Sequence, residues 1–103
     1  MKTKYPKRLA KDEVERSFYQ VRRVTETQIV RVEHALRIAE TTGSRECAES
    51  VRRKLVALKR IDLLLEASAD KILGELTPPF KAALLQDLLV RNQEILREAE
   101  EGA

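Results

Sequence analysis

The side chains that most readily carry catalysis or bind metals are scarce in this sequence and poorly spaced for either task. A single histidine, His34, directly follows Glu33, and the single cysteine, Cys47, lies on the far side of a glycine. Metal sites in helical bundles use Glu and His one turn apart, whereas adjacent residues point about 100° apart. A nucleophilic cysteine needs a base and an orienting group. We therefore expect no catalytic residue, metal or cofactor, and a buried or half-buried Cys47.

Cationic side chains form a second candidate group, whose chemistry is that of phosphate binding. Residues 1–60 hold 16 Lys and Arg against 8 Asp and Glu, whereas residues 61–103 hold 4 against 9. Arg53 and Arg60 are seven residues apart, as are Arg52 and Lys59, so each pair shares a helix face. Such a row can lie along a nucleic-acid backbone, although a solvated helix face is the simpler explanation. The candidate nucleic-acid-binding residues are Lys7, Arg8, Arg22, Arg23, Arg52, Arg53, Lys54, Lys59 and Arg60.

The segment VALKRIDLLLEASADKI, residues 56–72, resembles the opening helix of the all-helical chorismate mutases. That helix carries a Leu-Arg-x-x-Ile-Asp pattern with a leucine-rich continuation, and LKRID is one residue shorter. The resemblance implies a dimeric helical enzyme in which Lys59 or Arg60 holds a substrate carboxylate. Arg52, Arg53 and Gln93 are weaker candidates for the same role. The match lies in the second expected helix rather than the first, so a chorismate-mutase-like enzyme is a remote alternative.

Composition predicts that long helices position all of these side chains. Charged residues make up 36% of the 103 residues and aromatic residues 4%, and there are only three Gly and three Pro. An all-β fold needs a turn about every 8–12 residues. The small number of Gly and Pro residues therefore favours an all-α fold. No apolar run approaches the roughly 20 residues of a membrane span. With one cysteine and no secretory pattern, we expect a cytoplasmic protein.

Two long apolar-periodic runs flank Gly43 and predict an antiparallel helical hairpin. The first helix is expected over about 10–41 and the second over about 45–76, the latter with near-heptad spacing typical of a coiled coil. Gly43 suits the left-handed position after a helix, and Ser44 suits the N-cap of the next one. The second helix is either continuous or bent near Ser68.

The sequence TPPF predicts a third helix over about 78–100, because Pro favours the first helical position and Thr77 can cap it. Residues 1–9 form a basic arm without periodicity, which we expect to be flexible. Residues 10–103 are then a single helical domain.

One polar residue, Asp62, falls on the apolar stripe of the second helix. If the hairpin is symmetric about Gly43, Asp62 comes near Arg22, Arg23 and Thr25, so it could pair with an arginine or a hydroxyl. A polar residue at such a position often fixes register at some cost in stability.

The helices carry more apolar surface than one hairpin can bury, which predicts a homo-oligomeric helical bundle, most simply a dimer. The candidate interface residues are Val56, Ile61, Leu63, Leu64, Leu85 and Leu89.

We therefore expect a non-enzymatic adaptor, assembly or chaperone-like protein that binds itself, and possible partner helices, through helix–helix contacts. The alternative is a nucleic-acid-associated accessory protein of phage or plasmid type, with an architecture comparable to small terminase subunits, that uses its basic N-terminal half. That comparison is one of architecture alone.

Overall fold

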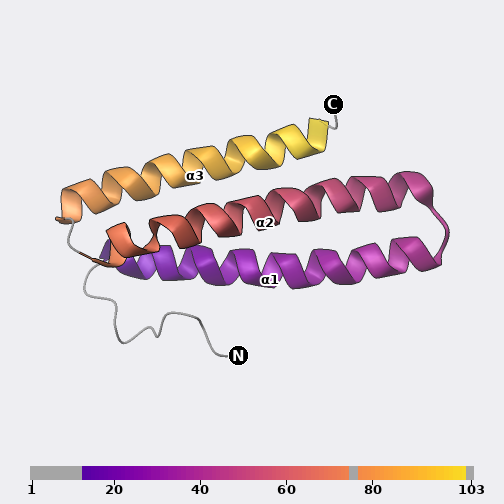
Figure 1. The fold of residues 1–103 in the computed structure, drawn as a ribbon, viewed down its shortest axis with the longest axis horizontal. Helices are drawn as coiled ribbons and strands as arrows, with labels where there is room; N and C mark the ends of the chain where they lie inside the picture. Colours follow the sequence, from indigo (N-terminus) through magenta and orange to yellow (C-terminus); the bar gives the residue numbers. More distant parts are fainter. Residues whose placement is uncertain (1–12, 75–76, 102–103) are drawn as a thin grey trace.

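The computed structural model describes residues 13–74 and 77–101, which form three helices. They are α1 (Glu13–Thr41), α2 (Arg45–Leu73) and α3 (Pro78–Glu101). Figure 1 shows α1 and α3 running in the same direction, with α2 antiparallel to both. No strand occurs in the described residues, and the predicted all-α class is confirmed. The expected arm at residues 1–9 lies outside the described part of the chain.

Gly43 reverses the chain between α1 and α2. Its φ is +78°, the only positive φ among the described residues, and this left-handed region is costly for any residue with a Cβ. The Thr42 N–H donates to the Ile38 carbonyl at 3.0 Å, which satisfies one carbonyl at the end of α1. Ser44 takes the N-cap position, but its side chain makes no capping hydrogen bond. Its carbonyl instead accepts the Ala48 N–H at 2.9 Å.

Helix α2 is continuous through Ser68, so the bend that the sequence left open does not form. It ends at Leu73 rather than near residue 76, because Gly74 leaves the helical region with φ −107° and ψ −123°. A Cβ at Gly74 would lie 2.3 Å from the Asp70 carbonyl oxygen, so this exit from the helix requires glycine. Helix α3 begins at Pro78 as expected, and the Thr77 carbonyl accepts the Lys81 N–H at 3.0 Å.

The core is largely aliphatic and centres on α2, which packs against both α1 and α3. Helix α1 contributes Phe18 to this cluster, and α3 contributes Leu85, Leu88 and Ile95. The α2 members are Ala57, Leu58, Ile61, Leu65, Ala69 and Ile72. Since α2 presents apolar side chains to two neighbours, its buried arc is wider than a single coiled-coil seam.

A buried ion pair joins the first turns of α1 and α3. The Lys81 Nζ donates to Glu15 Oε2 at 2.5 Å, and the two side chains are 5% and 1% exposed. Charges taken out of water at this depth are tolerated when they are paired and hydrogen-bonded. The pair therefore fixes the start of α3 against the start of α1.

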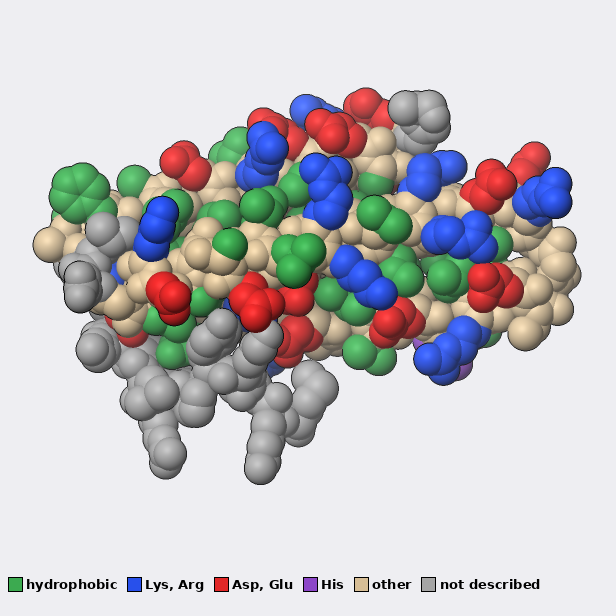
Figure 2. All heavy atoms as spheres, viewed as in Figure 1, with side chains coloured by type: hydrophobic (Ala, Val, Ile, Leu, Met, Phe, Trp, Pro, Cys, Tyr) green, Lys and Arg blue, Asp and Glu red, His purple; other side chains and the backbone are tan. Residues whose placement is uncertain are grey.

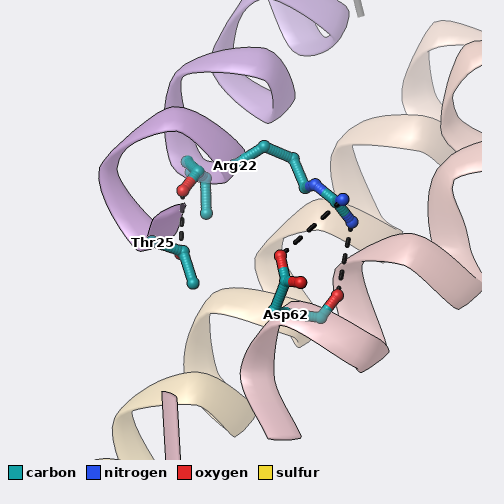
Figure 3. A network of polar contacts seen from close by, with 4 residues as sticks. Arg22, Thr25 and Asp62 are labelled. Carbon is teal, nitrogen blue, oxygen red and sulfur yellow. Dashed lines mark hydrogen bonds and ion pairs between the residues drawn. The ribbon is translucent and has the colours of Figure 1, made fainter. Parts of the chain in front are cut away.

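Asp62 pairs with Arg22, one of the partners that the hairpin register predicts (Figure 3). The buried Arg22 guanidinium donates through Nη1 to the Asp62 carbonyl at 3.3 Å. Its Nη2 lies 3.7 Å from Asp62 Oδ1, an ion-pair distance that is too long for a hydrogen bond. Thr25 does not take this role, because its hydroxyl donates to the Val21 carbonyl of its own helix at 2.8 Å.

Two exposed ion pairs also cross from α1 to α2. Arg52 lies 3.1 Å from Glu40, and Lys59 lies 3.9 Å from Glu33. Arg52 and Lys59 are seven residues apart on α2, and Glu33 and Glu40 are seven residues apart on α1. This is the heptad step of flanking pairs in coiled coils. Exposed pairs contribute only about 0.2–1 kcal/mol each, so they align the hairpin more than they stabilise it.

The buried pair gives a direct prediction about stability. Replacing Lys81→Met leaves the Glu15 carboxylate buried beside an apolar chain, so we expect a loss of about 3 kcal/mol in the free energy of unfolding. Urea denaturation followed by circular dichroism measures this loss. The matched control is Lys71→Met on the exposed side of α2, with an expected change below about 0.5 kcal/mol. Recovery in the double variant Glu15→Leu/Lys81→Met is expected, and equal stability of the two single variants would contradict the role of the pair.

Candidate functional site

Large apolar side chains remain exposed on all three helices. Their exposed fractions run from 45% for Val90 to 67% for Phe80. The others in the described residues are Val24, Val30, Ile38, Val56 and Leu63. Figure 2 shows apolar side chains interspersed with charges of both signs along the length of one face. Contiguous apolar surface marks contact sites more reliably than single exposed residues do, so the grouping of these residues is the important property.

Val56 and Leu63 form the outward face of α2, where they are 55% and 65% exposed. They are seven residues apart and therefore lie on one side of the helix. Both belong to the expected interface set. Lys59 and Arg60 lie between them in the sequence and are exposed as well. This outward face is therefore apolar at two points, with cationic side chains beside and between them and the acidic Glu49, Glu66 and Asp70 toward its ends.

Two of the expected interface residues, Ile61 and Leu85, are buried within the single chain. Ile61 is 2% exposed and Leu85 is 7% exposed, because both pack in the core between helices of the same chain. Leu64 and Leu89 are partly buried against that core. The error arises because α2 is covered by two helices, so its inward arc takes up positions that a single hairpin would leave outside.

The expected nucleic-acid-binding residues fall into three groups. Arg22 is not available to bind nucleic acid, because its side chain is 3% exposed and pairs with Asp62. Arg52 and Lys59 are exposed but pair with acidic residues of α1. Arg23, Arg53, Lys54 and Arg60 are exposed, while Lys7 and Arg8 lie outside the described residues.

The structure contains a groove between α1 and α3, and of its lining residues only Leu89 was among the expected interface residues. The groove has a volume of about 390 Å³, and it is lined by Ser17, Gln20, Val21, Val24, Thr25 and Leu89. None of these residues is charged, in a chain in which 36% of residues are charged. Interface cores are depleted in charge in the same way. The signal available in the sequence was this gap in the charge pattern, at helical spacing, on both helices.

The residues considered for catalysis are dispersed. His34 and Cys47 are both exposed, and the expectation of a buried or half-buried Cys47 is wrong. Ala48, one position further on, turns inward instead and is 7% exposed. In the described ranges, no group of three or more His, Cys, Asp or Glu side chains is placed to hold a metal ion.

The chorismate-mutase resemblance gains no support from this geometry. Lys59 and Arg60 lie on the outward face of α2 rather than inside the bundle, and Lys59 pairs with Glu33. Arg52 is paired with Glu40, and Arg53 and Gln93 are exposed. These side chains therefore do not converge on a common enclosed site.

Over residues 13–74 and 77–101, none of the helices has the length and apolar character needed to cross a bilayer. No protein-family model, curated protein or solved structure matches the chain.

Proposed function

We propose that this protein is a non-enzymatic helical assembly protein that acts through helix–helix contacts and associates with itself, most simply as a dimer. The observation that carries the proposal is the set of seven large apolar side chains that a single chain leaves 45–67% exposed. They lie on all three helices, and one of them, Val24, lines an uncharged groove between α1 and α3. Covering apolar area on association stabilises a complex at about 25 cal/mol per Å² before the costs of ordering are subtracted.

The arrangement of the three helices supports the same proposal. Helix α2 is packed on two sides, whereas α1 and α3 contact each other only sparsely. Helical bundles commonly complete such an open side with further helices. A second copy supplies them without any other gene product, and an adaptor or chaperone-like role follows if a partner helix occupies the same surface. The single exposed thiol of Cys47 fits a reducing cytoplasm.

Sedimentation equilibrium of the purified full chain tests this proposal. The expected result is a mass that rises with concentration from that of one 11.8 kDa chain to twice that value. A single-chain mass at every concentration would contradict self-association.

Nucleic-acid binding through α2 is a second candidate, which one specific observation favours. Arg53 and Arg60 are exposed, share a helix face, and make no ion pair within the described part of the chain. Cations that are not neutralised by a neighbouring carboxylate are the ones free to release counterions from a phosphate backbone.

A mobility-shift titration with duplex DNA at about 50 mM salt tests the second candidate, since phosphate contacts are strong at low ionic strength. Arg53→Gln/Arg60→Gln is expected to weaken binding about 10-fold. The matched double variant Arg52→Gln/Lys59→Gln removes two cations that already pair with glutamates, so we expect less than about a twofold change. Absence of binding by the unmodified protein would remove this candidate, and equal effects of the two double variants would contradict its assignment to Arg53 and Arg60.

A further inference from the structure

The α1–α3 groove continues beyond its lining residues as two charge-free helix edges. On α1, Gln28 follows Val24 by four residues and extends the edge. On α3, Leu89 shares a face with Gln86, Gln93 and Leu96, which are three, four and seven residues away. The first charged residue further along this side of α1 is Arg31. Both edges are therefore built from Ser, Thr, Gln, Val and Leu over several turns.

The outward face of α2 differs from these edges in charge. Arg52, Arg53, Lys59 and Arg60 surround Val56 and Leu63. Within the described residues, Arg52 and Lys59 lie within ion-pair distance of glutamates of α1, at 3.1 and 3.9 Å. A two-fold axis places the same patch of each copy against itself. On the outward face of α2, an axis through Val56 would bring Arg52 and Arg53 toward Arg60 and Lys59, and such like-charge contacts oppose association.

We propose that the α1–α3 groove, centred on Val24 and Leu89, is the face through which two copies of this chain associate about a two-fold axis. This inference rests on the proposed function and specifies its contact surface. The α1 and α3 helices of both copies then form a four-helix layer, with each α2 on the outside.

The chemistry of the groove selects a second copy as its occupant. An uncharged surface meets no repulsion from itself, which makes it self-complementary in charge. Glutamine amides carry donors and acceptors on one group, so Gln20, Gln28, Gln86 and Gln93 can pair with their own counterparts across the axis. A partner helix with strong charge of either sign would find no complementary charge along these edges.

The test compares two identical substitutions on two faces of the full chain. Val24 is 47% exposed in the groove, and Val56 is 55% exposed on the outward face of α2. Val24→Arg places like charges across the two-fold axis, so its dimer dissociation constant is expected to rise about 100-fold. Val56→Arg is expected to leave that constant unchanged within about twofold. Sedimentation equilibrium measures both constants, and circular dichroism verifies that both variants keep their helix content.

The outcomes separate this inference from the proposal on which it rests. A monomeric unmodified protein overturns both. A dimeric protein whose association resists Val24→Arg overturns the groove assignment alone, as does loss of association on Val56→Arg. Selective dissociation by Val24→Arg supports the groove.

Salt dependence of the unmodified protein gives a second measurement that needs no variant. Contact through uncharged edges predicts a dissociation constant that does not rise between low salt and about 1 M, where exposed charges are screened within about 3 Å. Weakening of the dimer by added salt would overturn the assignment, because it would indicate association through oppositely charged surfaces.

Discussion

Burial of the wide apolar arc of α2 is the constraint on which the rest of this structure depends. Leu58, Leu65 and Ile72 are almost completely buried, and their helix must find apolar cover on more than one side. Helix α1, which precedes the turn at Gly43, covers one side of α2. Helix α3, which begins at Pro78, covers the other side. The two covering helices therefore run parallel, flank α2, and leave an edge between them that neither fills.

Polar contacts fix where along α2 the other helices pack. Hydrophobic burial is non-directional, so it specifies the relative level of two helices less sharply than a polar contact at a packed position does. The contact of the buried Arg22 with the half-buried Asp62 sets the level of α1, and the buried Glu15–Lys81 pair sets the start of α3 relative to α1. A shift of either helix would separate a buried charge from its partner, which is far more costly than the loss of an exposed ion pair.

The sequence was sufficient for features that depend on local chemistry. Gly43 and Pro78 mark the turns because their backbone preferences act within a few residues, and Asp62 was traceable to Arg22 because the hairpin has one short turn. The Glu15–Lys81 pair joins residues from the first and third helices, and no local pattern fixes how those helices meet. At the start of α2, burial depends on a difference of one position along the helix. Ala48 is buried there, whereas the neighbouring Cys47, which was expected to be buried or half-buried, is exposed. The interface set failed at Ile61 and Leu85 because hydrophobicity alone does not distinguish a side chain covered by its own chain from one that awaits a partner.

One copy leaves its α1–α3 edge uncovered, and we propose that a second copy closes it. Cys47 offers a direct test, since it is the only cysteine, is exposed, and is not among the residues that line the groove. A nitroxide attached to Cys47 in the otherwise unmodified chain permits a dipolar electron-spin measurement of the distance between copies. Two-fold association through this edge predicts a modulation depth that corresponds to two coupled spins with one narrow distance distribution. Absence of any intermolecular coupling at concentrations where the protein is fully folded would contradict it.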